Sequence, residues 1–395
     1  MEESFIVGSV RTAVGKMGGT LKHITADYLA EQVIREVLAR HGSDVEVDEV
    51  ILGQAKQSAD QSNLARVALL RADLSVSTTG YTVHRQCGSG LQAINNADMQ
   101  LKLGLANAVI AGGAESMSTA PFYLRHARYG YRAGRGLLLD PNTESQPGSQ
   151  PIEEYGDLTM GMTAENLAEK YRISREEQDE FAHRSQELAD RAIKEGRFQQ
   201  QVVPYEVKER KRKLVFDRDE HPRLSSKEKL ATLPAVFKEG GTVTPGNASG
   251  RNDGAAALLM MNKRTMDVHG LKPKARILAQ AVSGVSPDIM GIGPVESTAK
   301  ALKQAGLQMK DIGLIELNEA FAAQSIAVIR EADMPMERVN VNGGAIALGH
   351  PIGATGAVIM TKLLHEMERT GERYGLATLC IGGGQGISTV IEYLH

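Results

Sequence analysis

The chain has 395 residues, of which 42% are hydrophobic and 24% are charged, as in an ordinary well-cored globular protein. Its formal net charge of −3 at pH 7 argues against nucleic acid or an anionic membrane as a partner, and no apolar run is long enough to span a bilayer. The two cysteines, Cys87 and Cys380, are too far apart in sequence to suggest a disulfide framework, and the N-terminus lacks a signal-peptide pattern, so we expect a cytoplasmic protein.

Short apolar runs alternate with amphipathic stretches over residues 1–118. The apolar runs predict buried strands, and the stretches between them carry apolar residues at helical spacing. The predicted strands are residues 5–10, 49–55, 80–86 and 107–116, and the predicted helices are residues 27–40, 63–72 and 90–104. This alternation predicts an α/β fold with mostly parallel sheets that are covered by helices.

The same order of elements returns from residue 271 to residue 395. The predicted strands are residues 275–282, 313–317, 338–342, 376–386 and 387–394, and the predicted helices are residues 295–307, 320–332 and 354–367. The run GAAALLMMN at 254–262 would supply the matching last strand of the first half. We therefore predict two βαβαβαββ halves and an inserted domain: the halves are residues 1–118 with 249–270 and residues 271–395, and the insertion is residues 119–248.

Four unusual segments follow predicted strands, and ligands of open parallel sheets bind beyond the carboxyl ends of the strands. The segments are QCGSG around Cys87, NEAF at 318–321, NGGAIALGHPIGATG at 342–356 and CIGGGQG at 380–386. A free cysteine is usually a packing residue, and Asn318 with Glu319 would fit equally well as caps of the next helix. Cys87 differs because it leads into a predicted helix N-terminus, where the macrodipole and the free N–H groups favour a thiolate.

A cysteine, a histidine and glycine-rich backbone together are suited to acyl transfer. A Cys87 thiolate needs a base within hydrogen-bond reach, and His350 lies in a loop of small residues. The N–H groups of glycine turns would hold the oxyanion of a tetrahedral intermediate. The second cysteine, Cys380, suggests a second proton transfer within the same cycle. A nucleotide-binding dehydrogenase is disfavoured because no G-x-G-x-x-G follows the first predicted strand.

Taken together, the motifs of the chain resemble those of the thiolase family, and within it the short-chain acetyl-CoA acetyltransferases of bacteria. The motifs are QCGSGLQA (86–93), GGAESMS (112–118), NASGRNDGAAA (247–257), NEAFAAQ (318–324), VNVNGGAIALGHPIGATG (339–356) and LATLCIGGGQG (376–386). The resemblance extends from residue 5 to the C-terminus. It implies that the two halves pack as a five-layered αβαβα core.

The resemblance also implies a mechanism with five catalytic residues. His350 would accept the proton of Cys87, which attacks an acyl-CoA thioester to give an acyl-enzyme. Cys380 would then remove a proton from Cα of a second acetyl-CoA, and the carbanion would attack the acyl group to give a 3-oxoacyl-CoA. His350 and a water positioned by Asn318 would hold the enolate oxygen, and the backbone N–H groups of Cys87 and Gly382 would hold the tetrahedral oxyanion.

Substrate binding and assembly are implied in the same way. The insertion would cover the pantetheine tunnel, with Ser249 as a hydrogen-bond partner of pantetheine and Arg223 near the nucleotide. Met160 and Phe321 would line the acyl pocket, and the remaining substrate-binding residues would be Phe237 and Ala320. Coenzyme A thioesters are substrates, and no metal or redox cofactor is implied. Segment 122–136 falls where bacterial short-chain members carry a tetramerising excursion, so we expect a homotetramer and at least a homodimer.

Two residues depart from the short-chain pattern. Thr159 stands where these members carry a histidine that shapes the acyl pocket, and Arg251 stands where leucine is common. A pocket without that imidazole leaves a broader-chain 3-ketoacyl-CoA thiolase of fatty-acid degradation as the alternative. Two other functions also stay open: a decarboxylating β-ketoacyl synthase, which would lack Cys380, and a non-catalytic protein that binds coenzyme A or a lipid.

Overall fold

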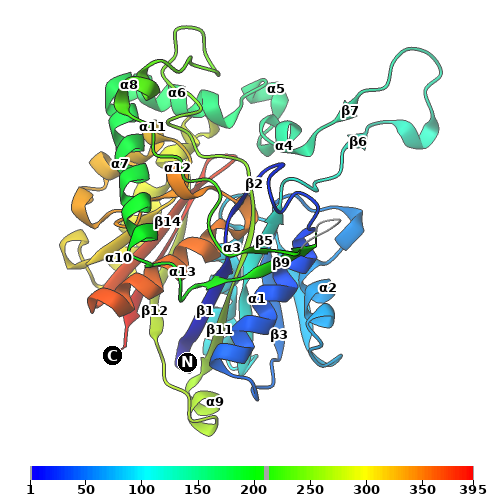
Figure 1. The fold of residues 1–395 in the computed structure, drawn as a ribbon, viewed down its shortest axis with the longest axis vertical. Coiled ribbons are helices and arrows are strands. Elements are labelled where there is room, and N and C mark those ends of the chain that lie inside the picture. The colour runs from blue at the N-terminus through cyan, green and yellow to red at the C-terminus, as the bar shows by residue number, and fades with distance from the viewer. Residues whose placement is uncertain (1, 209–212, 395) are drawn as a thin grey trace.

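The long strands of the chain fall into two groups, one from each half of the predicted repeat (Figure 1). The computed structural model describes residues 2–208 and 213–394. The strands of the first group are β1 (Ser4–Thr12), β3 (Glu49–Gly53), β4 (Thr79–Val83), β5 (Ala108–Ser116) and β11 (Asn252–Asn262). The strands of the second group are β12 (Ala275–Gly284), β13 (Leu314–Leu317), β14 (Tyr374–Ile381) and β15 (Gln385–Tyr393).

Each group forms a mixed sheet, not the mostly parallel sheet that the alternation predicted. β3 pairs in parallel with β4 and β5, but β11 lies antiparallel between β5 and β1. β13 and β14 are parallel, and β15 lies antiparallel between β14 and β12. In the second group only residues 382–384 separate β14 from β15, and so short a connection joins antiparallel strands. A single pair, Ile6 with Ala275, links the two sheets.

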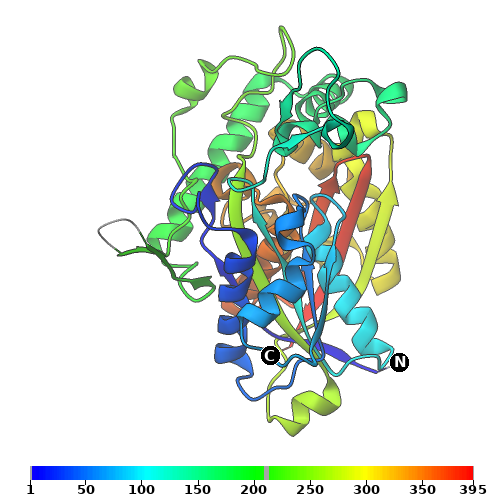
Figure 2. The ribbon, with the colours of Figure 1, turned by 90° about the vertical axis from the view of Figure 1, so that its right-hand side faces the viewer.

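Helices cover the outer faces of both sheets and fill the space between them (Figure 2). The helices are α1 (Ala26–His41) and α2 (Leu64–Arg71) outside the first sheet, α3 (Ser89–Lys102) and α13 (Ile352–Thr370) in the middle, and α10 (Gly293–Ala305) and α11 (Ala322–Glu331) outside the second sheet. Of the 19 residues of α13, 14 are buried, as expected for a helix with neighbours on every side. The predicted five-layered αβαβα arrangement is confirmed.

One predicted strand, residues 338–342, is reduced to a single bridge between Val339 and Ile315. The next residue, Asn340, has a φ of +48°, which takes the backbone out of the extended conformation. Its side chain accepts a hydrogen bond from Leu317 N at 2.9 Å and donates one to Leu317 O at 2.8 Å. The side chain of Asn340 therefore makes the hydrogen bonds with the backbone of β13 that a further strand was expected to make.

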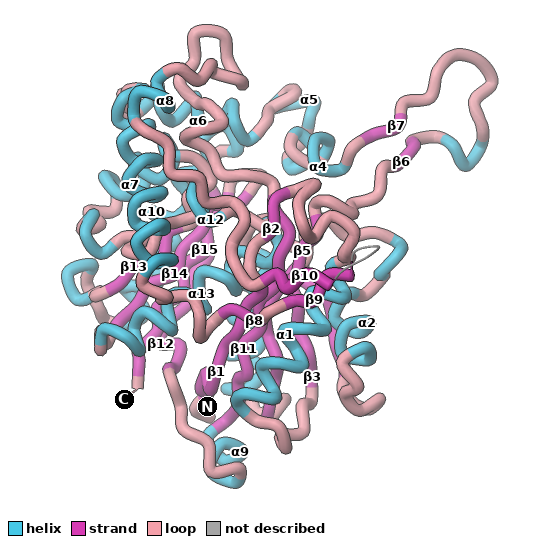
Figure 3. Tube along the Cα trace, in the orientation of Figure 1, coloured by secondary structure: helices cyan, strands magenta, loops and turns pink. Residues whose placement is uncertain are grey.

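The inserted segment, residues 119–248, lies mostly above the carboxyl ends of the core strands as drawn in Figure 3. Its helices are α4 (Pro141–Glu144), α5 (Ile152–Tyr155), α6 (Met160–Lys170), α7 (Arg175–Lys194) and α8 (Lys227–Ala231), and its strands are β6 (Tyr123–Leu124), β7 (Leu138–Leu139), β8 (Val202–Val203), β9 (Tyr205–Lys208) and β10 (Lys213–Phe216). A long arm that carries β6 and β7 projects away from the body.

Besides short 3-10 helices, the described chain has three further short elements: β2 (Gly15–Lys16), α9 (Lys263–Val268) and α12 (Ala345–Leu348). β2 pairs with β11, and α12 packs against α7 of the insertion. Over residues 2–208 and 213–394, no helix combines the length and the apolar character needed to cross a membrane.

Candidate active site

A cavity of about 180 Å³ lies where the two halves and the inserted segment meet. Eight of the predicted catalytic and substrate-binding residues line it: Cys87, Met160, Phe237, Ser249, Ala320, Phe321, His350 and Gly382. They come from the ends of β4, β13 and β14, from the start of α13 and from the insertion. The carboxyl ends of the strands therefore meet at one site, as the rule for open α/β sheets predicts.

Glycines allow the two middle helices to approach closely enough to bring Cys87 and His350 to the same cavity. A Cβ on Gly90 of α3 would lie 2.9 Å from the carbonyl oxygen of Gly353, at the start of α13. A Cβ on Gly356, one turn further along, would lie 2.2 Å from the backbone N of Leu91. Any larger side chain at these positions would push the two helix N-termini apart.

Cys87 lies just before α3 and is partly exposed, with Gly88 as the helix N-cap. Burial raises the pKa of the Cys87 thiol, whereas a hydrogen bond from the N–H of Gly382 and the charge of Lys56 lower it. Gln86, immediately before it, has a φ of +46°, an unfavourable value for a side chain of this type. Strained backbone of this kind collects at functional sites, because the surrounding structure holds a side chain in a required position.

His350 is buried and held by two hydrogen bonds. Its Nδ1 lies 2.6 Å from Oγ1 of Thr355, and its backbone N donates to Oδ1 of Asn252 at 2.9 Å. Burial, assisted by the positive charge of Lys56, lowers the pKa of His350 to about 4. The ring is therefore neutral at pH 7, and because Thr355 occupies Nδ1, Nε2 is the nitrogen left to act as a base toward the cavity.

Cys380 and Asn318 lie behind the cavity wall and are fully buried. Cys380 packs against Met290, Ala320 and the cavity residues Met160 and Phe321. Burial, together with a negative charge on nearby Cys87, raises the pKa of the Cys380 thiol strongly. Among the described residues, neither side-chain atom of Asn318 has a hydrogen-bond partner. Buried polar groups are normally paired, so this asparagine has free hydrogen-bonding capacity beside the site.

The end of the insertion and Ser249, the residue directly after it, form one wall of the cavity. Ala248 forms an isolated bridge with Phe321, and Ser249 N donates to the carbonyl oxygen of Ala320 at 2.9 Å. The rings of Phe237 and Phe321 meet edge to face with their centroids 6.1 Å apart. Arg223 does not reach this cavity: it is exposed, and its guanidinium donates to the carbonyl oxygen of Pro245 at 3.0 Å.

Two buried glutamates fix the loops around the site. Glu115, in GGAESMS, accepts hydrogen bonds from the backbone N–H groups of Ala55, Lys56 and Gly353. Glu319, in NEAF, accepts hydrogen bonds from Ser185, Asn340 and Ile346. Glu319 therefore joins the end of β13 to the turn before α12 and to the insertion, and it does not cap the helix that follows it.

The structure also adds cavity residues that the sequence had not singled out. Lys56, Gln86, Asn142 and Ser149 all line the cavity. Lys56 follows β3, so the rule about the carboxyl ends of strands would have pointed to it as well. The positions of Asn142 and Ser149 depend on how the insertion folds over the core, which no local pattern in the sequence reveals.

The two departures from the short-chain pattern have different surroundings. Thr159 is the N-cap of α6, where its Oγ1 accepts a hydrogen bond from the N–H of Met162 at 3.3 Å, and it does not line the cavity. Arg251 does line the cavity, and its Nη1 lies 3.9 Å from a carboxylate oxygen of Asp140. The side chain at position 159 therefore stabilises a helix end and does not form the pocket surface.

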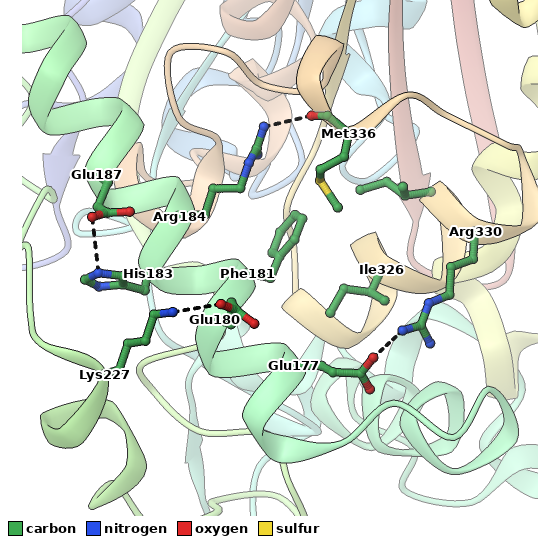
Figure 4. A pocket seen from close by; sticks show the side chains of 11 residues that line it. Glu177, Glu180, Phe181, His183, Arg184, Glu187, Lys227, Ile326, Arg330 and Met336 are labelled. Carbon is green, nitrogen blue, oxygen red and sulfur yellow. Dashed lines mark hydrogen bonds and ion pairs between the residues drawn. The ribbon is translucent and has the colours of Figure 1, made fainter.

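A second hollow, of about 420 Å³, lies between α7 and α11, and none of the predicted site residues lines it (Figure 4). Several of its charged side chains pair with one another: Lys227 Nζ lies 2.7 Å from Glu180 Oε1, and Arg330 contacts Glu177, whereas Arg184 donates to the carbonyl oxygen of Met336. Mutual pairing of this kind leaves little charge for a ligand. Among the described residues, no group of three or more His, Cys, Asp or Glu side chains could hold a metal ion.

Family models match nearly the whole chain. The model "Thiolase, N-terminal domain" matches residues 4–264, and the model "Thiolase, C-terminal domain" matches residues 271–393. The chain belongs to the thiolase family. This confirms the resemblance that the motifs suggested. The boundary between the two matches, at residues 264–271, falls between β11 and β12, where the repeat begins again.

Relatives of this thiolase match it over their full length. The acetyl-CoA acetyltransferase of Syntrophomonas wolfei is 48% identical over an alignment of 405 positions, which covers 99% of each chain. Among solved structures, the acetyl-CoA acetyltransferase of Bacillus anthracis matches with a TM-score of 0.97 and 47% identity, covering 100% of this chain and 99% of that one. Human mitochondrial 3-ketoacyl-CoA thiolase in complex with CoA matches with a TM-score of 0.94 and 42% identity, covering 100% of this chain and 98% of that one.

Proposed function

We propose that this thiolase is an acyl-CoA C-acyltransferase that condenses two acetyl-CoA into acetoacetyl-CoA and CoA, and that also catalyses the reverse thiolysis. The observation that carries the proposal is that Cys87 and His350 line one cavity, with the Cys380 thiol directly behind its wall. Two thiols and one neutral imidazole supply a nucleophile, its base and a second acid–base group. Identity of 48% to acetyl-CoA acetyltransferases over the full length supports the same reaction.

In the first step, Nε2 of His350 takes the proton of Cys87, and the thiolate attacks the thioester carbonyl of acetyl-CoA. The oxyanion is held by the backbone N–H groups of Cys87 and Gly382, and the hydrogen bond from Gly382 N–H to the Cys87 thiol supports this assignment. CoA leaves with the proton from His350, and an acetyl group remains on Cys87.

In the second step, the Cys380 thiol gives its proton to the neutral imidazole of His350, and the resulting thiolate removes a proton from Cα of a second acetyl-CoA. His350 and a water held by Asn318 stabilise the enolate oxygen, and the unpartnered side chain of Asn318 supports this role. The carbanion attacks the acetyl carbonyl on Cys87, a carbon–carbon bond forms, and the thiolate of Cys87 leaves and takes the proton back from His350. A thiol with a strongly raised pKa is suited to this step because its thiolate is a strong base.

The inserted segment binds coenzyme A in this proposal. Ser249 hydrogen-bonds pantetheine, with Phe237 and Ala320 beside it, and exposed Arg223 meets the nucleotide outside the cavity. Met160 and Phe321 contact the acyl group. The human thiolase that matches in complex with CoA supports a coenzyme A site in this fold.

The projecting arm supports an oligomer. Its exposed apolar side chains include Phe122, Tyr129, Leu137 and Leu138, and such side chains on an arm that projects from the body are typical of an interface. We propose a homotetramer, with a homodimer as the minimum.

Two free cysteines, one of them the proposed nucleophile, suit the reducing conditions of the cytoplasm.

A broader-chain 3-ketoacyl-CoA thiolase is the second candidate. The match to human mitochondrial 3-ketoacyl-CoA thiolase, with a TM-score of 0.95 and 43% identity, favours it. Thiolysis rates across 3-oxoacyl-CoA substrates of increasing length separate the two candidates, since a sharp optimum at acetoacetyl-CoA would exclude the second.

The substitution Cys87→Ala tests the proposal. Thiolysis of acetoacetyl-CoA should fall by at least about 10⁴-fold, because the covalent route is lost. Labelled acetyl-CoA should no longer leave an acetyl group on the protein. The melting temperature should be nearly unchanged because Cys87 is only partly buried. Retained turnover in this variant would contradict an acyl-Cys87 intermediate.

A further inference from the structure

One wall of the active-site cavity is polar and carries a buried cation. The apolar side of the cavity includes Met160, Met290 and Phe321. The polar part of the lining is formed by Lys56, Gln86, Asn142, Ser145, Gln146 and Ser149, and it adjoins the apolar part at Met160, whose N–H donates to Oε1 of Gln146 at 3.2 Å. Lys56 and Arg251 are both cationic, and no aspartate or glutamate is among the described residues that line the cavity.

A row of hydrogen bonds leads along this wall from the reacting groups to the ammonium group of Lys56. Gln86, next to Cys87, donates to Oγ of Ser149 at 3.1 Å, and Ser149 donates to the carbonyl oxygen of Ser145 at 2.7 Å. Lys56 Nζ donates to Oγ of Ser145. The row begins beside the proposed oxyanion site, since a Cβ on Gly382 would lie 3.3 Å from Oγ of Ser149.

The Lys56 ammonium group has no anionic partner of its own. Lys56 is 7% exposed, and no carboxylate in the described chain lies within ion-pair distance of its Nζ. The other bond of Nζ is a long one, 3.4 Å to the carbonyl oxygen of Pro141. The carboxylate of Glu115 is nearby but already accepts hydrogen bonds from three backbone N–H groups. A buried cation is costly unless an anion pairs with it.

The Cys87 thiolate and a negatively charged substrate are the anions that this cavity can hold, because no carboxylate is among its described lining residues. An acyl chain on Cys87 that lies along the polar wall would end near Lys56. A methyl-ended chain in that position would remove water from Lys56 and the serine row and would return no hydrogen bond. A chain that ends in a carboxylate would pair with the ammonium group by a charge-assisted hydrogen bond.

We propose that Lys56 binds a carboxylate at the end of the acyl chain, so that the preferred 3-oxoacyl-CoA substrates are those of dicarboxylic acids. The inference rests on the proposed thiolase reaction and specifies its substrate class. In thiolysis, the Cys87 thiolate attacks the C3 carbonyl, the C2–C3 bond breaks, and acetyl-CoA leaves after its carbanion takes a proton from Cys380. His350 then returns a proton to the Cys380 thiolate and takes the proton of the CoA thiol, and CoA attacks the acyl-Cys87 and releases a carboxyacyl-CoA, with the terminal carboxylate unchanged throughout.

A different role for Lys56 would give a different kinetic pattern. Its charge lowers the pKa of Cys87 and of His350, so Lys56 could act only by favouring the thiolate. That role would serve every substrate to the same degree. A role in substrate binding would raise kcat/KM only for substrates with a carboxylate at the chain end. The ratio of kcat/KM between matched substrates therefore separates the two roles of Lys56.

The experiment measures kcat/KM for thiolysis of 3-oxohexanedioyl-CoA and of 3-oxohexanoyl-CoA, which differ only at the chain end, and of two longer pairs matched in the same way. The wild-type enzyme should prefer the carboxylate-ended member of at least one pair. Lys56→Met should reduce that preference by about 10- to 100-fold, the loss expected for a hydrogen bond between charged groups. Lys56→Arg should retain part of it, and Lys22→Met, which removes an exposed lysine outside the cavity, should retain all of it.

Two results would overturn the inference. The first is a wild-type enzyme without preference for a carboxylate in any of the three pairs, a result that needs no variant and so does not depend on folding. The second is a Lys56→Met or Lys56→Gln enzyme that loses activity equally with both members of a pair, which would assign Lys56 to the ionisation of Cys87. Failure of the proposed thiolase reaction is a separate outcome, because it would appear as wild-type protein without thiolysis of any substrate, acetoacetyl-CoA included.

Discussion

The two cysteines of the chain lie close together in very different surroundings. Cys87 is partly exposed, precedes a helix and receives a hydrogen bond from Gly382 N–H, which together with the charge of Lys56 opposes the effect of burial on its pKa. Cys380 is fully buried at the end of β14 among Met290 and Ala320, and the charge of Cys87 adds to the effect of burial on its pKa. The same side chain is thus placed once where a thiolate is accessible and once where a thiolate is a strong base.

This difference suggests that each thiol serves a different half of the reaction. Exchange of labelled CoA with acetyl-CoA needs only acylation and deacylation of Cys87. Thiolysis of acetoacetyl-CoA also needs the cleavage of a carbon–carbon bond. Variants that lose one activity and keep the other therefore test the division of labour between the two cysteines.

The largest separation is expected for Cys380→Ala. Thiolysis of acetoacetyl-CoA should fall by about 10²- to 10⁴-fold, the usual contribution of a general acid or base. Exchange between labelled CoA and acetyl-CoA should persist, as should acetyl labelling of Cys87. Cys87→Ala is the matched control, because it should abolish both activities. Equal loss of exchange and thiolysis in Cys380→Ala would contradict separate roles for the two thiols.

Asn318→Ala should weaken the same carbon–carbon step to a smaller extent. Loss of the group that holds the enolate's water should lower thiolysis by about 10²-fold, as for one donor of an oxyanion hole. Exchange should be much less affected. Because the side-chain atoms of Asn318 have no described partner, the substitution should not lower the melting temperature.

Asn340→Ala is the matched control for that experiment. The side chain of Asn340 makes hydrogen bonds with Leu317 N, Leu317 O and Glu319 Oε1, all of them buried. Its loss should lower the melting temperature clearly, since the backbone of β13 would lose its partners. A drop in melting temperature for Asn318→Ala similar to that for Asn340→Ala would show that Asn318 has a structural role.

Local patterns in the sequence predicted the repeat and the segments around Cys87, His350 and Cys380, whereas the five layers and the substrate-binding residues were implied by the resemblance to thiolases. Alternating apolar runs locate strands, and residues that follow parallel strands converge in space. The turn at Asn340 was not predictable in this way. In the sequence, an asparagine whose side chain makes the hydrogen bonds of a missing strand cannot be told from any polar residue at the end of a strand. Lys56 was missed for another reason: a single lysine in a loop is usually exposed, and only the fold of the insertion over it makes it a buried cation.

The smallest effect is expected for Thr355→Val, and it concerns the residue that both steps share. Thr355 is 2% exposed, and its hydroxyl holds Nδ1 of His350 at 2.6 Å. Without it, the imidazole loses its fixed orientation toward Cys87, and a single neutral hydrogen bond corresponds to about a tenfold change in rate. Because His350 acts in both halves of the reaction, exchange and thiolysis should fall by the same factor, unlike the selective loss in Cys380→Ala.

A matched control for Thr355→Val lies on the same helix. Thr361 is also fully buried in α13, and its hydroxyl has no hydrogen-bond partner in the described chain. Thr361→Val should leave both activities unchanged and should not lower the melting temperature, since it removes an unpaired polar atom. If Thr355→Val reduced thiolysis alone, His350 would have to be assigned to the carbon–carbon step only, and the base for Cys87 would have to be another group at the cavity.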